Sequence, residues 1–128
     1  GEMPLGTGTI NAPIALAEES SICRCVAPDG KPSVTEYTVL CAKNGHSLVR
    51  VEPKTGRTHQ IRVHFASLGH PLTGDDMYGG SRTLIERHAL HAAQLRFFEP
   101  LDSTPHLVEA PLPQDMTDLC AKLELFGQ

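Results

Sequence analysis

The chain has 128 residues, of which 40% are hydrophobic and 20% charged, a composition close to that of an average globular domain with one core. No run of eighteen apolar residues occurs, and the first six residues lack the basic-then-apolar pattern of a secretory signal. These features argue against a membrane protein and a secreted protein, and we expect a cytoplasmic one.

The net charge of −4 is unevenly distributed along the chain. Residues 43–96 carry eight basic and four acidic groups, whereas the segments on either side are acidic. A basic middle permits a polyanionic partner, although uneven charge also arises by chance. The four cysteines show neither CxxC nor zinc-ribbon spacing, so we expect them to stay reduced and to bind no metal.

The first half of the chain predicts extended structure. A Gly- and Pro-rich opening leads to a short strand at residues 22–27, which ends at a turn. Residues 34–41 and 46–52 then form a hairpin around Asn44-Gly45, a pair that favours a type I′ turn. Alternation along the first hairpin strand places Tyr37, Val39 and Cys41 on one face.

The second half predicts helices as well as strands. Thr58 is placed to cap a helix that runs through Leu68, with Ile61 and Phe65 on its apolar face and Gly69 as its stop. The later elements are a helical turn at 84–87, a strand at 107–110, and a terminal helix at 114–126 that ends at Gly127. Residues 88–98 fit either a strand or a helix, and their β-rich end favours the strand. The predicted fold class is α+β, with a mainly antiparallel mixed sheet and flanking helices.

The densest polar cluster lies in the turn and helix at residues 54–64. Arg62 falls at the border between the apolar face and solvent, where a guanidinium can bind a carboxylate or phosphate through two nitrogens. Composition alone favours a simpler interpretation, in which these polar residues bond loop carbonyls and face water. Those residues are Arg57, His59, Gln60 and Arg62.

The order of residues in this cluster is more specific than its composition. The block resembles the signature of the RluA-type RNA pseudouridine synthases, and further matching stretches extend the resemblance to roughly residues 8–113. The block itself is Pro53-Lys54-Thr55-Gly56-Arg57-Thr58-His59-Gln60-Ile61-Arg62-Val63-His64. The flanking stretches are Gly8 to Ile14, Gly30 to Leu40, Leu68 to Asp75, Tyr78-Gly79, Arg87 to Ala92 and Ala110 to Pro113.

The resemblance implies an isomerase that converts uridine in RNA to pseudouridine without a metal or organic cofactor. It implies that Arg62 ion-pairs with a catalytic aspartate, and that Arg57, His59 and Gln60 brace the turn or contact RNA. The family's nucleophilic aspartate stands in a His-Arg-Leu-Asp block, and none of the six aspartates here has those neighbours. Tyr37 is interpreted as a packing residue, and Asp75 as a residue that fixes its loop.

Three hypotheses remain open from the sequence. In the first, residues 1–128 are the C-terminal portion of a pseudouridine synthase catalytic domain, inactive alone and able to dimerise through an exposed sheet edge. In the second, the chain is a non-catalytic module that binds rRNA or tRNA. The third is a metal-dependent hydrolase whose ligands are histidines. Its candidate ligands are His59, His64, His88 and His91.

Overall fold

The computed structural model describes residues 1–17, 23–92, 94–98 and 105–125, with the backbone alone for 94–98 and 105–109. Strands and helices are grouped along the chain and do not alternate, as in the α+β class that the sequence predicts. In chain order the elements are β1 (Gly6–Asn11), β2 (Ile14–Leu16), β3 (Arg24–Val26), β4 (Val34–Lys43), β5 (His46–Pro53), α1 (Gln60–Ser67), the 3₁₀ helix η1 (Asp76–Tyr78), β6 (Gln94–Phe98), β7 (Pro105–Glu109) and α2 (Gln114–Lys122).

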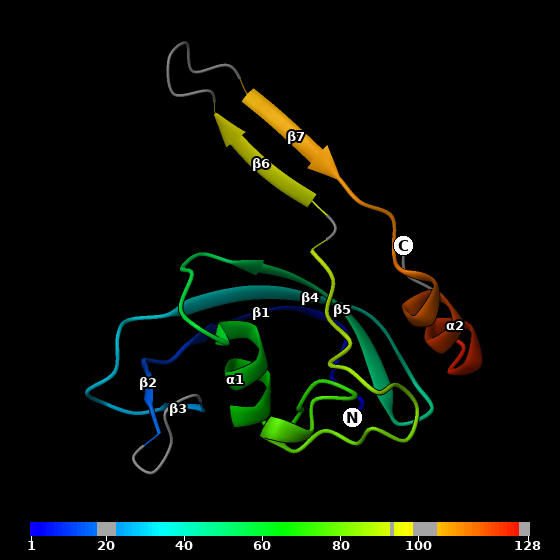
Figure 1. Ribbon diagram of the computed structural model, residues 1–128, viewed down its shortest axis with the longest axis horizontal. Coiled ribbons are helices and arrows are strands. Elements are labelled where there is room, and N and C mark those ends of the chain that lie inside the picture. The colour runs from blue at the N-terminus through cyan, green and yellow to red at the C-terminus, as the bar shows by residue number, and fades with distance from the viewer. Residues whose placement is uncertain (18–22, 93, 99–104, 126–128) are drawn as a thin grey trace.

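The centre of the fold is a three-stranded antiparallel sheet in the order β1-β4-β5, with α1 against one face (Figure 1). The hairpin between β4 and β5 turns at Asn44 and Gly45, whose φ angles are 53° and 75°. Two positive φ angles in a two-residue connection are what a type I′ turn requires, so this turn is confirmed. The remaining strands form the separate antiparallel pairs β2–β3 and β6–β7.

The predicted face of β4 is interrupted by a bulge. The register with β5 shifts between Val39, which lies opposite Val49, and Cys41, which lies opposite Leu48. Val39 therefore packs in one hydrophobic cluster and Cys41 against another. The prediction that Tyr37, Val39 and Cys41 share one face is wrong for Cys41, because an extra residue in one strand reverses the alternation beyond it.

The helix α1 begins later than predicted and has a different cap. Its N-cap is His59, which adopts a left-handed conformation with φ 55°, and no side chain caps the helix, so Thr58 is not the cap. At the other end Gly69 has φ 81°, in agreement with the predicted stop. Leu68 is 43% exposed, whereas the polar residues Gln60 and His64 are buried. The helix thus places a polar stripe in the interior.

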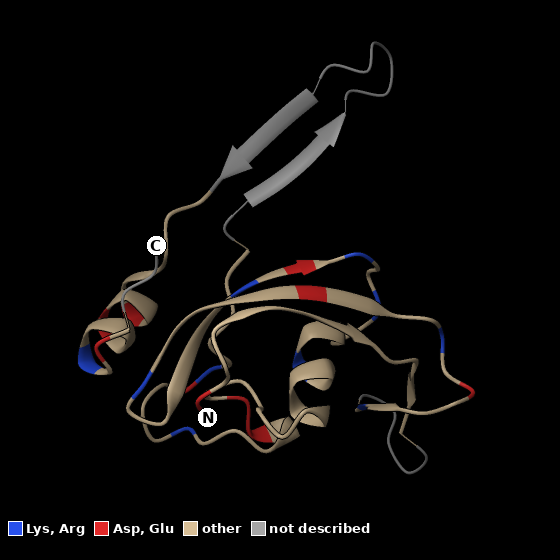
Figure 2. Ribbon diagram, turned by 180° about the vertical axis from the view of Figure 1, so that it is seen from behind, with Lys and Arg blue, Asp and Glu red and all other residues tan. Residues whose placement is uncertain are grey.

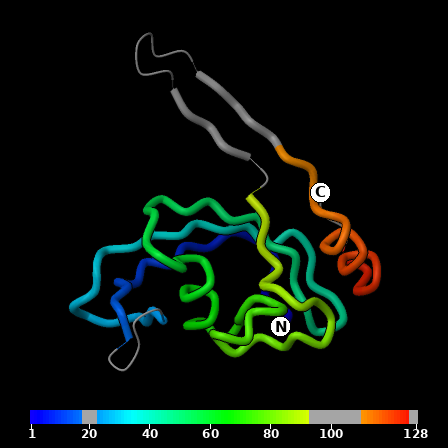
Figure 3. Tube along the Cα trace, viewed as in Figure 1, coloured from blue at the N-terminus to red at the C-terminus, as the bar shows by residue number. Residues whose placement is uncertain are grey.

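The segment after α1 has a different local structure from the one predicted. Residues 84–87 form no helical turn, and the helical turn instead lies at η1. Side-chain bonds to nearby carbonyls hold the segment in irregular structure: Arg82 Nε donates to Glu86 O, and Arg87 Nη1 donates to His88 O. The chain start lies beside this segment, where Gly1 approaches His70 (Figure 3).

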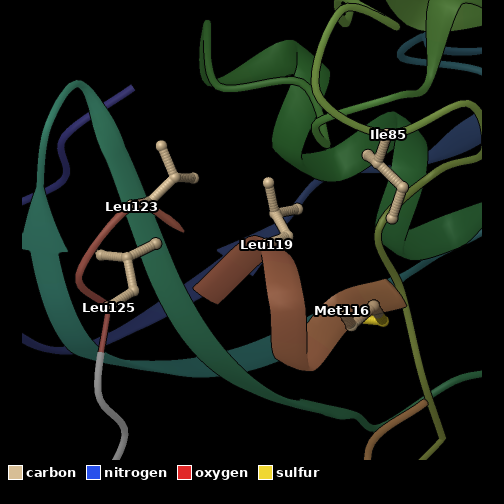
Figure 4. Close-up of a cluster of buried hydrophobic side chains, with 5 residues drawn as sticks. All are labelled: Ile85, Met116, Leu119, Leu123 and Leu125. Atoms are coloured by element: carbon tan, nitrogen blue, oxygen red, sulfur yellow. The ribbon is translucent and has the colours of Figure 1, made fainter. Parts of the chain in front are cut away.

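Among the side chains that the structure describes, two hydrophobic clusters form the core. One lies between the three-stranded sheet and α1 and is centred on Met3, Ile10, Val39 and Phe65. The other packs α2 and the residues after it against the loop around Ile85, which precedes β6 (Figure 4). Its members are Ile85, Met116, Leu119, Leu123 and Leu125.

The last helix is shorter than predicted. α2 ends at Lys122, and Glu124 with φ 58° turns the chain so that Leu125 N–H bonds Cys120 O at 2.8 Å. Residues 126 and 127, including the predicted Gly127 stop, lie outside the described residues. Over the described part of the chain, no helix combines the length and the apolar character needed to cross a membrane.

Candidate functional site

A pocket of about 260 Å³ lies where the end of β5, the following turn and the start of α1 meet. It brings together all four residues that the sequence singles out. Its lining is Pro53, Thr55, Gly56, Arg57, His59, Gln60, Ile61, Arg62 and Leu90. A larger open hollow of about 560 Å³ lies on the sheet and contains none of these four residues.

Gln60 forms the inner wall of the pocket and is only 4% exposed. Its amide nitrogen donates to Val34 O and to Thr35 Oγ1, both at 2.9 Å. Its amide oxygen accepts from Thr55 Oγ1 at 2.6 Å and from Arg57 N–H at 3.1 Å. All four hydrogen-bonding positions of the amide are therefore used inside the chain. This geometry favours the bracing role for Gln60 over an RNA contact.

The same network continues to a fully buried histidine. His64 Nε2 lies 2.9 Å from Ala12 O, so this nitrogen carries the hydrogen and donates it. His64 Nδ1 then accepts from Thr35 Oγ1 at 2.7 Å. The hydroxyl of Thr35 thus accepts from Gln60 and donates to His64, and every polar group in the chain of bonds is satisfied. The network joins α1 to β4 and to the residues before β2.

Arg57 and His59 are half-buried at the mouth of the pocket. Arg57 Nε donates to Pro32 O at 3.0 Å, and its terminal guanidinium nitrogens form no ion pair with the described residues. His59 Nδ1 lies 2.7 Å from the hydroxyl of Tyr78, and that hydroxyl also accepts the Arg24 N–H at 3.0 Å. The Tyr78 hydroxyl therefore links the His59 ring to the backbone at Arg24.

The surroundings of His59 favour its neutral form. Partial burial is the main cause of a lowered pKa, and the positive charges of Arg62 and Arg24 add to it. The imidazole also meets the ring of Tyr78 edge to face, with the ring centroids 5.7 Å apart. A neutral His59 can accept or donate one hydrogen bond without attracting phosphate by charge.

Arg62 has a partner within the chain. Its Nε and Nη2 each lie 2.9 Å from one carboxylate oxygen of Asp75, and the two side chains are 14% and 1% exposed. Hydrogen bonding to Asp75 is the main cause of a raised pKa for the guanidinium. Tyr78 stacks under it at 5.2 Å from the ring centroid. Asp75, which the sequence analysis interpreted as a residue that fixes its loop, is therefore also an ion-pair partner of Arg62.

The basic middle of the chain is largely neutralised in three dimensions. Of the seven basic residues in 43–96 whose side chains the structure describes, five form ion pairs, and Figure 2 shows basic and acidic residues interspersed along the ribbon. The pairs are Lys43–Glu124, Lys54 with Glu36 and Glu52, Arg62–Asp75, Arg82–Asp76 and Arg87–Asp115. Among the described residues, Arg50 and Arg57 form no ion pair, and Arg57 alone of these two lines the pocket.

The metal-ligand hypothesis finds no geometric support. Residues 88–92 are not helical, so His88 and His91 do not share a helix face. His91 Nε2 instead lies 3.1 Å from Ala110 O, and His64 is occupied in the buried network. Within the described ranges, no three His, Cys, Asp or Glu side chains are grouped to hold an ion.

Sequence reasoning missed two members of the site, Asp75 and Tyr78. Both belong to a stretch that carried the family resemblance, but the resemblance gave them no role at the pocket. Their contacts with Arg62 and His59 span 13 to 19 residues of sequence, a separation that periodicity cannot detect. The one available signal was a Gly-rich loop with an acidic residue and a tyrosine directly after a basic helix.

Similarity to known proteins extends over β5, the following turn and α1, the segments that build the pocket. A family model for RNA pseudouridylate synthase matches residues 2–67, which include β1 to β5 and α1. The chain belongs to this family. The predicted resemblance to RluA-type enzymes is thereby confirmed, and with it the α+β fold class.

Among the similar curated proteins are two bacterial enzymes. An uncharacterized RNA pseudouridine synthase of Bacillus subtilis, YjbO, is 49% identical over 119 residues, which cover 93% of this chain and 42% of YjbO. Ribosomal large subunit pseudouridine synthase D of Escherichia coli K12 is 40% identical over 133 residues, with 93% and 40% covered. The chain thus spans about two fifths of these relatives.

Solved structures give the same fold. Human RNA pseudouridylate synthase domain containing 1 aligns with a TM-score of 0.72 and 30% identity over 99% of this chain and 63% of that chain. Human RNA pseudouridylate synthase domain containing 4 aligns with a TM-score of 0.68 at 24% identity, which supports the fold alone.

Proposed function

We propose that the protein to which this chain belongs isomerises uridine to pseudouridine in RNA, and that residues 1–128 form the C-terminal portion of its catalytic domain. The observation that carries this proposal is the pocket, where Arg57, His59, Gln60 and Arg62 meet in a chain of the pseudouridine synthase family. The reaction breaks the glycosidic bond, turns the uracil and joins its C5 to the sugar.

Each of the four pocket residues that the sequence singles out receives a role in this proposal. Arg62 holds the carboxylate nucleophile ionised and aimed, because a nearby guanidinium lowers a carboxylate's pKa. That carboxylate comes from outside these 128 residues, since the His-Arg-Leu-Asp block is absent from the sequence. Arg57 and His59 contact RNA at the pocket mouth, Arg57 by charge and His59 as a neutral partner. Gln60 braces the wall and touches no RNA.

The reaction needs a flipped nucleotide but no cofactor in this proposal. Unstacking a base costs a few kcal/mol, which contacts with the RNA backbone offset. We propose rRNA or tRNA as the substrate class and the cytoplasm as the location. The choice of rRNA is supported by the name of one relative, which is a ribosomal large subunit pseudouridine synthase.

The deciding experiment is tritium release from RNA labelled at uridine C5, with the 128-residue chain and the full-length gene product assayed in parallel. Activity in the full-length product and none in the 128-residue chain is the expected result. Release by the shorter chain would mean that one of its own carboxylates replaces the missing nucleophile. No release by either protein would contradict the proposal.

A second candidate function is RNA binding without catalysis. It is favoured by the absence of the nucleophile block together with an unpaired Arg57 at the pocket mouth. Binding of labelled RNA by the 128-residue chain, measured at increasing salt, tests this function because phosphate contacts weaken as salt rises. Undetectable binding at low ionic strength would remove it.

A further inference from the structure

The loop between α1 and η1 is built to fix Asp75. Asp75 N–H donates to Leu72 O at 3.1 Å, and Asp75 O accepts from Tyr78 N–H at 3.2 Å and Gly80 N–H at 2.7 Å. Gly80 allows this close approach, because a Cβ there would lie 2.0 Å from Leu72 O. The residue is 2% exposed. A carboxylate held by its own backbone and buried to this degree has little freedom to leave its partner.

Asp75 occupies one edge of the Arg62 guanidinium. The pair uses Nε and one hydrogen of Nη2, at 2.9 Å each, while the other Nη2 hydrogen meets only the weak acceptor Met77 Sδ at 3.8 Å. Among the described residues, none accepts a hydrogen bond from Nη1. Tyr78 fixes the plane of the guanidinium. The Nη1–Nη2 edge can therefore bind a second acceptor at the pocket that Arg62 lines.

We propose that Asp75 is a positioning residue, which holds Arg62 by one edge so that its Nη edge receives a second carboxylate from outside this chain. The inference rests on the proposed function and deepens it, because the second carboxylate is the nucleophile of the isomerisation. A guanidinium has five donors in one plane, so two carboxylates can bind it side by side. Asp75 never contacts RNA in this arrangement and acts only through Arg62.

The opposite possibility is that Asp75 is a temporary partner, which Arg62 leaves when the nucleophile is present. The two cases predict different effects of the same substitution. A positioning residue is needed during turnover, whereas a temporary partner competes with the nucleophile and its removal leaves or raises activity. Substitution at Asp75 in the full-length gene product therefore separates them.

The test compares Asp75→Asn and Asp75→Ala with Asp76→Asn as the matched control. Asp76 is the next residue in the chain, but its side chain is 67% exposed and pairs only loosely with Arg82 at 3.6 Å. In tritium-release kinetics we expect kcat to fall about 10- to 100-fold for the Asp75 variants, with KM for RNA nearly unchanged. The Asp76 variant should keep both constants.

A second measurement guards against a variant that merely folds badly. The Nε–H signal of Arg62 in ¹⁵N NMR spectra of the 128-residue chain should exchange slowly in the wild type and rapidly in Asp75→Asn, while the backbone spectrum stays folded. A kcat that falls only in proportion to the unfolded fraction would overturn the inference.

The outcomes also distinguish a failure of the role proposed for Asp75 from a failure of the proposed function. An active wild-type enzyme with an equally active Asp75→Asn variant overturns the role of Asp75 alone. An inactive wild-type product overturns the proposed function, and the role of Asp75 with it.

Discussion

Gln60 shows how one buried amide organises the candidate site. Its four hydrogen bonds reach Val34, Thr35, Thr55 and Arg57. Gln60→Ala would remove four hydrogen bonds at once and leave the Arg57 N–H without its acceptor, whereas Val34 O, Thr35 Oγ1 and Thr55 Oγ1 each keep one other bond. We expect the free energy of unfolding to fall by about 2–4 kcal/mol, since each lost bond costs about 0.5–1.5 kcal/mol and an unsatisfied buried group about 1–3 kcal/mol. Urea denaturation followed by circular dichroism measures the change.

Gln114→Ala is the matched control for that substitution. Gln114 also donates a side-chain hydrogen bond, to Asp118 at 2.7 Å, but both groups are exposed on α2. Water replaces such a bond, so the free energy of unfolding should change by less than about 0.5 kcal/mol. Equal effects of the two substitutions would show that the buried network does not stabilise the turn.

His59 should make stability depend on pH. Its pKa lies below the ordinary value of 6.5, chiefly because burial disfavours the charged ring and because Arg62 repels it. As the pH falls through 6.5 towards the folded-state pKa, the unfolded chain takes up a proton that the folded chain does not. The free energy of unfolding therefore decreases over that interval.

His59→Asn removes this group while keeping a residue that tolerates the left-handed conformation at φ 55°. We expect the variant to lose less stability than the wild type between about pH 7 and pH 5. Denaturation at several pH values checks the slope, and the C2 proton resonance of His59 reports its pKa directly. Parallel slopes for the two proteins would mean that His59 titrates normally in the fold.

The residues of the candidate site could be predicted from the sequence only where they lie close together along the chain. Arg57, His59, Gln60 and Arg62 were gathered correctly because they lie on one turn and one helix. Asp75 was not assigned to Arg62, because the pairing depends on how a loop folds back across the helix. The buried polar stripe was missed for a related reason, since apolar periodicity places Gln60 on the solvent side.

At the scale of elements, the β4–β5 turn offers the cleanest test. Gly45 has φ 75°, where a Cβ clashes with the backbone, so Gly45→Ala should reduce the free energy of unfolding by about 1 kcal/mol. Gly56→Ala is the control: no heavy atom lies within 4 Å of its Cβ position and its φ is not in the left-handed region. It should be neutral or slightly stabilising. Thermal unfolding of both variants measures these changes in stability.

The elements that sequence predicted well are those with strong local signals. Asn44-Gly45 fixes the hairpin, and Gly69 ends α1, because both depend on backbone conformations that few residues adopt. The cap of α1 and the end of α2 were wrong, since His59 and Glu124 take left-handed conformations that their residue types do not announce. Packing of the second core cluster compensates for the strain at Glu124.

At the scale of the molecule, the last helix is joined to the sheet by few contacts outside its hydrophobic cluster. Asn44 Nδ2 donates to Leu123 O at 2.8 Å, and Lys43 pairs with Glu124 at the surface. The three-stranded sheet itself is left with β1 and β5 as its outer strands among the described residues. Outer strands carry unpaired backbone groups, which can join another copy of the chain.

We therefore predict that the 128-residue chain self-associates through the edge at β1. Leu5, which directly precedes β1, is 70% exposed and adds apolar surface at that edge. Leu5→Lys should lower the dimer fraction in sedimentation velocity runs over a range of concentrations, because charge at an edge opposes strand pairing. Leu112→Lys makes the same change at a residue that is 41% exposed and lies outside the three-stranded sheet, so it should leave association unchanged. A chain that stays monomeric at every concentration would show that the twist and polar side chains of β1 already protect this edge.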